Sequence, residues 1–302
     1  MSTIKVLLSS YNGDKYIEDQ VESILQQKVD CDLELIIRDD GSSDETISIL
    51  DKLCEKHSNI TFVKGKNLGV NHSFFELIKM AGKSEYYAIS DQDDIWLPEK
   101  LQIAIDCLEN DKNLLLYGSA SMCVDENLDY ISINPIIKRN ITIYNTMIQN
   151  FIGGHTQVFT YSFAQIILKN YDLNKIFAYD AYFTNVAAIY SGLYFDTNSY
   201  VKYRLHANNL VGTGTNFYDW IKKNINRVKK GQSHEYAKQF EYITFVYKDK
   251  FSREELQECQ RFLKSRKNIV ERFVYACCMK FYRQSLKETF VFKLLYILGG
   301  WN

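Results

Sequence analysis

Three carboxylates lie within four residues at Asp91, Asp93 and Asp94, directly after the apolar run 86–89. Carboxylates this close repel one another unless a cation, or a ligand that carries one, neutralises them. Hard cations such as Mg²⁺ or Mn²⁺ prefer carboxylate oxygen and usually keep open positions for substrate phosphates. The spacing therefore fits a metal that binds a diphosphate, and equally a solvated acidic turn that caps the helix opened by Pro98.

A second polar turn contains Asp39 and Asp40, followed by Gly41. Two carboxylates on a glycine turn can accept hydrogen bonds from a pyrimidine imide N–H and from ribose hydroxyls, or can simply cap the next helix. Ser42 and Glu45 have capping-box spacing, which predicts where that helix begins. No GxGxxG follows the first expected strand and no GxxxxGK[ST] occurs, which argues against dinucleotide and P-loop sites.

A sheet must position these turns, and the apolar pattern predicts one. Short continuous apolar runs indicate buried strands, and the segments between them have the three and four spacing of helices. This alternation predicts a parallel, helix-flanked α/β sheet with ligands at the carboxyl ends of its strands. The expected strands are 4–9, 33–37, 60–63, 86–89 and 114–117, and the expected helices are 16–27, 44–57, 70–80 and 99–108.

Beyond Gly118 the regular alternation stops, and we expect a mixed second half that completes the same domain. Weaker strands are expected at 128–133, 155–160 and 199–204, and helices at 142–150 and 175–190.

The charge of the chain is divided unevenly. Residues 1–216 hold 18 basic and 28 acidic side chains, whereas residues 217–302 hold 18 basic and 9 acidic ones. This shift predicts a domain at 1–215 and a basic, mostly helical C-terminal region at 216–302. The basic region is either a solvated helical bundle or a surface that docks on an anionic membrane. No nucleic-acid motif accompanies the charge, so we expect no nucleic-acid partner.

At 46% hydrophobic and 24% charged, the 302 residues have the composition of a globular protein. The seven cysteines lack disulfide or zinc spacing, which favours reduced thiols in a cytoplasm. The first ten residues do not resemble a signal peptide, and no run of 18 uncharged apolar residues occurs. We therefore expect a cytoplasmic protein, peripheral to the inner face of the plasma membrane where the basic region docks.

Several motifs follow one another in a fixed order. They are Leu8-Ser9-Ser10-Tyr11-Asn12-Gly13, Ile37 to Asp44, Asn67-Leu68-Gly69 and Ser90 to Trp96, then Ile152-Gly153-Gly154, Tyr179-Asp180 and Tyr203 to Asn209. Together they resemble the family 2 inverting glycosyltransferases of the GT-A fold, and within that family the bacterial rhamnosyltransferases of surface polysaccharide synthesis. The resemblance covers roughly residues 4–214 and implies a GT-A nucleotide-sugar-binding domain with a mostly parallel sheet, plus a C-terminal helical extension.

The resemblance also implies roles for individual residues. It makes Asp180 the catalytic base, and Asp93 with His206 the ligands of Mn²⁺ or Mg²⁺. The implied donor-binding residues are Ser9, Tyr11, Asp39, Asp40, Asp91 and Asp94, and the implied acceptor residues are Gly153, Gly154, His155 and Trp96. His155 can equally satisfy a strand edge. The relatives usually have His-Asp-Trp around the base, where this chain has Tyr179-Asp180-Ala181-Tyr182, so the acceptor stays open.

The expected activity is a metal-dependent, inverting transfer of a sugar, L-rhamnose from dTDP-L-rhamnose, to a glycan or lipid-linked glycan acceptor. A carboxylate takes the proton of the acceptor hydroxyl, and a cation offsets the charge of the leaving diphosphate. The alternatives are a UDP-hexose glycosyltransferase of the same fold and a non-catalytic nucleotide-binding domain with a membrane-docking tail. A phosphohydrolase is disfavoured because strand one ends in Ser9-Ser10-Tyr11 rather than in paired acids.

Overall fold

The computed structural model describes residues 2–206, 226 and 232–301. The chain groups into two compact units. Unit 1 comprises Met1–Pro135, Ile152–Tyr171 and Gly192–Asn208, and unit 2 comprises Ile136–Phe151, Asp172–Ser191 and Asn209–Asn302.

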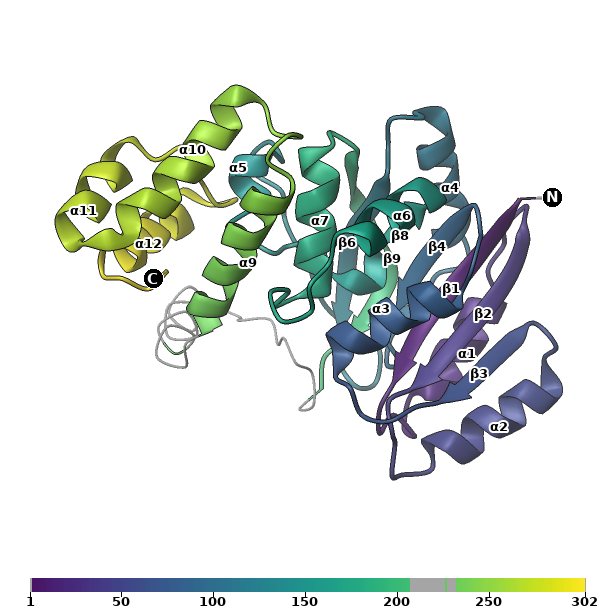
Figure 1. Ribbon diagram of the computed structural model, residues 1–302. Helices are drawn as coiled ribbons and strands as arrows, with labels where there is room; N and C mark the ends of the chain where they lie inside the picture. Colours follow the sequence, from purple (N-terminus) through teal and green to yellow (C-terminus); the bar gives the residue numbers. More distant parts are fainter. Residues whose placement is uncertain (1, 207–225, 227–231, 302) are drawn as a thin grey trace. The chain divides into compact units, whose positions relative to one another are not determined.

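Unit 1 is built on a mixed sheet in the order β3-β2-β1-β4-β8-β6-β9-β5, with β7 paired to β6 (Figure 1). The first four strands in this order are parallel to one another. Strand β8 joins β4 and β6 in antiparallel pairs, while β6 and β9 are parallel. The strands are β1 Thr3–Ser10, β2 Asp32–Asp39, β3 Ile60–Lys64, β4 Tyr86–Ser90, β5 Ile95–Trp96, β6 Leu116–Val124, β7 Tyr130–Asn134, β8 Val158–Thr160 and β9 Leu193–Arg204. The predicted parallel first half and the mixed strand directions of the second half are both confirmed. Residues 136–151 and 172–191, which were expected to complete the same domain, group with unit 2.

Helices cover both faces of this sheet. Helices α1 (Ile17–Leu25), α2 (Thr46–Lys56) and α4 (Lys100–Asn110) contribute their apolar sides to one core with β1, β2 and β4. Helices α3 (Val70–Met80) and α6 (Tyr161–Lys169) lie on the opposite face, in front of the sheet in Figure 1. Because both faces are covered, β4 is buried along its whole length and β1 along most of it, which explains why these runs could be identified from the sequence.

The carboxyl ends of the parallel strands meet at one edge. Ser10 pairs with Asp39 across β1 and β2, and Leu8 pairs with Ser90 across β1 and β4. The turns that follow these three strands therefore lie side by side, where open α/β sheets bind ligands.

The predicted capping box between Ser42 and Glu45 is wrong. Helix α2 begins at Thr46, and Glu45 makes no side-chain capping hydrogen bond. Ser42 Oγ instead donates to Asp39 Oδ2 at 2.5 Å and accepts from the backbone N–H of Asn12 at 2.8 Å. The hydroxyl thus ties the turns after β1 and β2 together.

Gly118, where the regular pattern stops in the sequence, lies inside β6 and does not end the strand. A Cβ at this position would lie 2.3 Å from Cγ2 of Ile152, so the glycine leaves room for Ile152 to pack against the strand. The close packing of Ile152, rather than a turn, therefore explains why residue 118 is glycine.

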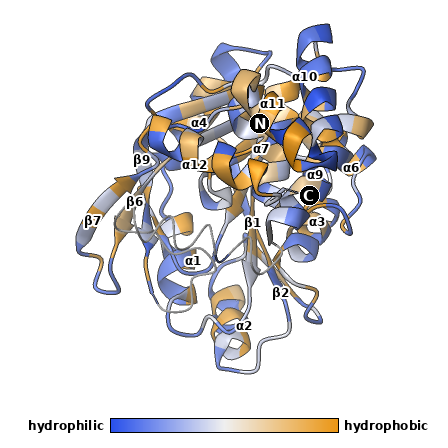
Figure 2. Cartoon of the chain, turned by 90° about the vertical axis from the view of Figure 1, so that its left-hand side faces the viewer, coloured by the Kyte–Doolittle hydropathy of each residue, from blue (hydrophilic) through white to orange (hydrophobic). Residues whose placement is uncertain are grey.

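Unit 2 is helical in its described residues. Its helices are α5 Ile143–Thr146, α7 Tyr179–Ile189, α9 Gln232–Val246, α10 Arg253–Lys264, α11 Ile269–Cys278 and α12 Leu286–Ile297. Phe262 is fully buried and contacts the rings of Phe240, Phe281 and Tyr296. Apolar segments, orange in Figure 2, recur on α11 and α12.

The expected helical C-terminal region is confirmed for 232–301, whereas the expected boundary at 215 and 216 lies outside the described residues. Among the helices that the structure describes, none combines the length and the apolar character needed to span a bilayer.

Candidate active site

The acidic turn after β4 meets the end of β9. Asp93 Oδ2 lies 2.9 Å from Nε2 of His206, and the two side chains are 15% and 8% exposed. Strand β9 reaches the turn because it pairs antiparallel with β5, which follows the acidic cluster directly. The structure therefore brings together the two residues predicted as metal ligands.

His206, Tyr16 and Arg204 form a stack of side chains. The Tyr16 ring stacks on the His206 ring with centroids 5.0 Å apart, and the Arg204 guanidinium lies 4.6 Å from the Tyr16 ring centroid. Arg204 also donates from Nε to the backbone carbonyl of Asp93 at 3.1 Å, and from its backbone N–H to Asp94 Oδ1 at 3.2 Å. One buried arginine thus orients both Asp93 and Asp94.

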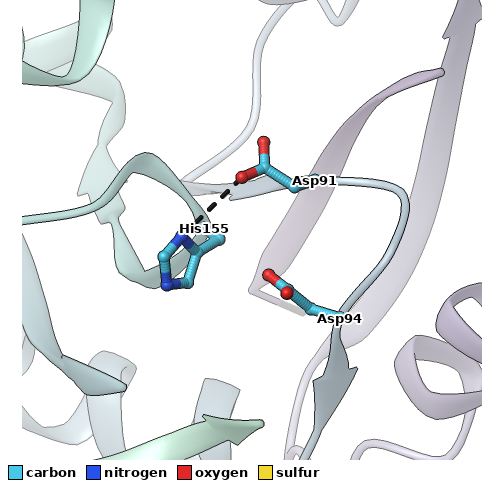
Figure 3. A group of neighbouring side chains, drawn as sticks. All are labelled: Asp91, Asp94 and His155. Atoms are coloured by element: carbon cyan, nitrogen blue, oxygen red, sulfur yellow. Dashed lines mark ion pairs between the residues drawn. The ribbon is translucent and has the colours of Figure 1, made fainter. Parts of the chain in front are cut away.

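Asp91, Asp94 and His155 form a second group, shown in Figure 3. Each offers one ligand atom, and these atoms lie within 4.8 Å of one another. His155 Nδ1 is 3.7 Å from Asp91 Oδ2, and Asp94 Oδ2 is buried without a hydrogen-bond partner. Two carboxylates and one imidazole are a ligand set that Mn²⁺ accepts. The unpartnered Asp94 oxygen is free to bind such an ion.

Asp94 and the nearby Lys100 are both fully buried. Burial, and then the charges of Asp93 and Asp91, raise the pKa of Asp94 well above its ordinary value. Burial likewise lowers the pKa of Lys100, although the charge of Asp94 acts in the opposite direction. Lys100 Nζ lies 3.3 Å from the Trp96 ring centroid and has no hydrogen-bond partner. Trp96 itself is 2% exposed and packs in the core of unit 1.

His155 is enclosed by the protein. Its ring stacks on Tyr203 with centroids 4.6 Å apart, and its Nε2 is 2.7 Å from Ser121 Oγ. Burial, and then the charge of Lys100, lower the pKa of His155 to about 3, so the imidazole is neutral at pH 7. A Cβ on Gly153 would lie 2.5 Å from the imidazole Cε1, so this glycine makes room for the ring, and Gly154 begins the short helix that carries it.

Asp39, predicted to bind the nucleotide, is buried and saturated with hydrogen bonds. Its Oδ1 accepts from the backbone N–H groups of Gly41 and Ser42 at 3.0 and 2.8 Å. Its Oδ2 accepts from the hydroxyls of Ser10 at 3.0 Å and Ser42 at 2.5 Å. This carboxylate shapes the turn after β2.

Asp40 forms a buried ion pair with Arg38. The Arg38 guanidinium lies 2.5 Å from Asp40 Oδ1, and both side chains are 5% exposed. Asp40 also accepts from the backbone N–H groups of Leu68 and Gly69 at 2.9 and 2.8 Å. The pair therefore holds the loop before α3 against the end of β2.

Ser9 and Tyr11 lie at the end of β1. Ser9 Oγ is 2.6 Å from Ser73 Oγ on α3, and the Tyr11 side chain is 47% exposed. Gln92 accepts from the Tyr11 backbone N–H at 2.8 Å and donates to the Tyr11 carbonyl at 3.1 Å. A Cβ on Gly13 would lie 2.3 Å from the Gln92 side chain, so the glycine admits it.

Asp180 is the one predicted site residue that belongs to unit 2. It lies in the first turn of α7, where a carboxylate is favoured by the helix dipole. Asn150 Nδ2 donates to its Oδ2 at 2.9 Å, which orients the carboxylate.

Sequence reasoning assigned no role to five residues that lie at the site: Tyr16, Arg38, Gln92, Lys100 and Arg204. Arg38, Gln92 and Arg204 stand inside the quoted motifs, so their position was a usable signal. Tyr16 is the N-cap residue of α1 and Lys100 the first residue of α4, and the apolar spacing of these segments gave no sign that the two side chains lie at the site.

The chain matches known proteins along most of its length. Residues 5–172 match the family model described as glycosyl transferase family 2, which is more than half of the 302 residues. The dTDP-rhamnosyl transferase RfbG of Shigella flexneri is 29% identical over 228 residues, which span 70% of this chain and 75% of that protein.

Two solved structures share the fold at low sequence identity. S. aureus TarS 1-349, in complex with UDP-GlcNAc, is 17% identical with a TM-score of 0.56, covering 86% of this chain and 79% of TarS 1-349. The mannosyltransferase PcManGT from Pyrobaculum calidifontis, in complex with GDP-Man and Mn²⁺, is 15% identical with a TM-score of 0.56, covering 98% of this chain and 85% of that one.

Proposed function

This chain belongs to glycosyl transferase family 2 and is a glycosyltransferase of the GT-A fold, and we propose that it transfers L-rhamnose from dTDP-L-rhamnose to a glycan acceptor of bacterial surface polysaccharide. The observation that carries the proposal is the pairing of Asp93 with His206 beside Asp91 and Asp94, at the sheet edge where the donor diphosphate is expected. The similarity to a dTDP-rhamnosyl transferase supports the choice of sugar.

We propose that Asp93 and His206 hold Mn²⁺ or Mg²⁺, with Asp91 toward the diphosphate and Asp94 toward the sugar. Oxygen and imidazole ligands fit Mn²⁺. When bound, the ion offsets the negative charge that develops on the leaving nucleoside diphosphate. Arg204 contributes by orienting Asp93 and Asp94 through its backbone and side-chain hydrogen bonds.

Asp39 and Asp40 act on the donor mainly through the turn that they shape. Asp39 is fully buried and accepts four hydrogen bonds, and Asp40 is paired with Arg38. Such a turn presents a rigid wall to the base and ribose, while the exposed Tyr11 ring offers a surface for stacking on the base.

In the proposed reaction Asp180 accepts the proton of the acceptor hydroxyl. The hydroxyl oxygen forms a bond to the anomeric carbon as the bond from that carbon to the diphosphate oxygen breaks, so the configuration inverts. Asn150 keeps the Asp180 carboxylate oriented through its hydrogen bond. Gly153, Gly154 and His155 would contribute to the acceptor side by fixing the backbone near β8.

The acceptor is a glycan or a lipid-linked glycan, and the enzyme works in the cytoplasm at the inner face of the plasma membrane. The excess of basic residues after residue 216 supports attraction to an anionic surface. Lys222, Lys223, Lys229 and Lys230, which contribute to that excess, lie outside the described residues.

A donor screen tests the proposal. The purified chain is incubated with Mn²⁺ or Mg²⁺ and a panel of sugar nucleotides, and both thermal stabilisation and release of nucleoside diphosphate are measured. We expect dTDP-L-rhamnose to give the largest effect, with about 2.7 kcal/mol of stabilisation at 100 times its dissociation constant. If a UDP-hexose stabilises the chain more and is turned over faster than dTDP-L-rhamnose, the donor is a UDP-hexose. If a sugar nucleotide binds but is not turned over with any glycan acceptor, the non-catalytic alternative is favoured.

A further inference from the structure

Helix α11 of unit 2 exposes a group of apolar side chains. Ile269, Val270, Phe273 and Val274 are 54%, 67%, 57% and 63% exposed. Their spacing places them on one side of the helix. The opposite side packs inward, since Arg272, Tyr275 and Ala276 are buried.

Helix α12 repeats this arrangement. Leu286, Phe290 and Leu294 recur every fourth residue and are 77%, 64% and 44% exposed, and Leu298, next in the series, is 74% exposed. The inward side is formed by Phe292 and Tyr296, which are buried. Helix α12 therefore exposes large apolar side chains as well as burying others, with Lys287 beside them at its start, and α11 and α12 are in contact with each other.

Exposed apolar side chains on two helices in contact indicate a surface that binds a partner. Large apolar side chains grouped on the exposed surface of a domain mark interaction sites. The eight residues Ile269, Val270, Phe273, Val274, Leu286, Phe290, Leu294 and Leu298 are named here the α11–α12 apolar residues.

The charge around these residues decides between partners. Residues 261–298 contain nine basic side chains and two acidic ones. Three of the nine are paired with glutamates, namely Arg261, Arg266 and Lys280, and Arg272 is buried. The cations that matter here are exposed Lys267, two residues before α11, and exposed Lys287, beside Leu286 at the start of α12. A second copy of the chain would bring these like charges together, whereas an anionic lipid surface attracts them.

We propose that the α11–α12 apolar residues dock on an anionic lipid bilayer, with their side chains at the boundary between headgroups and acyl chains and with Lys267 and Lys287 at the lipid phosphates. Helices of this composition lie in the plane of the interface rather than across it. This docking surface rests on the proposed location at the inner face of the plasma membrane and names the residues that make the contact. Its test uses neither donor nor acceptor, so its failure would leave the proposed sugar transfer standing.

Vesicle flotation of the full chain tests the proposal. We expect the protein to float with vesicles of phosphatidylcholine and phosphatidylglycerol and to stay behind with phosphatidylcholine alone. The Phe273→Ser/Phe290→Ser double variant should lower the partition coefficient by at least about tenfold, or roughly 1.4 kcal/mol. The Lys267→Glu/Lys287→Glu variant should lower it by roughly fivefold or more for each charge.

Matched controls come from unit 1. Tyr130 is 62% exposed on β7, and Lys112 is exposed after α4, so Tyr130→Ser and Lys112→Glu remove an aromatic ring and reverse a charge on the other unit. Both should leave the partition coefficient unchanged. Equal losses in these controls would overturn the assignment of the surface.

A second measurement needs no variant. Backbone hydrogen exchange in α11 and α12 of the unaltered chain should slow when phosphatidylglycerol vesicles are added, while exchange in β7 should not. The proposal is overturned if the unaltered chain ignores anionic vesicles. It is also overturned if sedimentation shows a dimer that the Phe273→Ser/Phe290→Ser variant separates, because a second copy would then cover these residues.

Discussion

His206 Nε2 lies 2.9 Å from Asp93 Oδ2, although the two residues are 113 positions apart in the chain. The contact joins the turn after β4 to the end of β9, and the Tyr16 ring stacks on the imidazole. A carboxylate and an imidazole held this way can exchange their mutual contact for a shared cation with little rearrangement, which lowers the ordering cost of metal binding.

Removing either member of this pair should weaken metal binding. We expect Asp93→Asn and His206→Ala each to reduce Mn²⁺ affinity at least about tenfold, measured by calorimetric titration. His57→Ala is the matched control, because His57 follows α2 at the edge of the sheet away from the site. A loss with His155→Gln but none with His206→Ala would assign the ion to Asp91, Asp94 and His155 instead.

Asp180→Asn should abolish turnover and spare donor binding. The amide keeps the shape of the carboxylate but cannot accept the proton, so the turnover rate should fall by about 10² to 10⁴. Release of nucleoside diphosphate and thermal stabilisation by the donor measure the two properties separately. Asp249→Asn, at an exposed acid of the same unit, should change neither. Parallel loss of turnover and donor binding would argue against the role of base.

Asp40→Asn should destabilise the fold strongly. It leaves Arg38 buried beside a neutral side chain, and breaking a buried ion pair in this way costs about 3–5 kcal/mol. Urea unfolding measures the change. The control is Lys64→Gln, which breaks the half-exposed pair with Asp51 and should cost less than about 1 kcal/mol. Similar costs for the two variants would show that the Arg38 pair is well solvated.

The buried His155 should make stability depend on pH. Its pKa in the folded chain is about 3, below the ordinary 6.5, so between these values the unfolded chain binds more protons. The contribution of His155 to the free energy of unfolding is therefore fully present above about pH 6.5. It decreases by up to about 1.4 kcal/mol per pH unit as the pH falls toward 3. Urea unfolding of metal-free protein from pH 7 to pH 4 measures the slope, and His155→Gln should reduce it. An unchanged slope in that variant would contradict the prediction.

Gly118→Ala should destabilise by overpacking. The added Cβ would lie 2.3 Å from Cγ2 of Ile152, and forced contacts of this kind cost about 1–3 kcal/mol. Gly118→Ala should cost less free energy of unfolding in the Ile152→Ala background than in the unaltered chain, because Ile152→Ala removes the Cγ2 atom that the new Cβ would meet. If the free-energy changes of Gly118→Ala and Ile152→Ala simply add in the double variant, as they do for distant sites, contact with Ile152 is not the reason why residue 118 is glycine.

The sequence by itself determined the sheet of unit 1 and the edge at which its site lies. Runs such as Tyr86 to Ile89 are apolar throughout because both faces of the strand are covered, and this local pattern is visible without a structure. The polar turns follow the strands directly, so the position of Asp39, Asp91 and Asp93 at the carboxyl edge also followed from local order.

Only the tertiary structure decided what these side chains contact. The sequence predicted that Asp39 and Asp40 line the nucleotide, and this role stays a prediction. The fold adds that Asp39 accepts four hydrogen bonds and that Asp40 pairs with Arg38. It also brought His155 to Asp91 through the antiparallel pairing of β8 with β4. Such contacts join residues far apart in the chain, and they depend on strand order and register, which short-range periodicity does not encode.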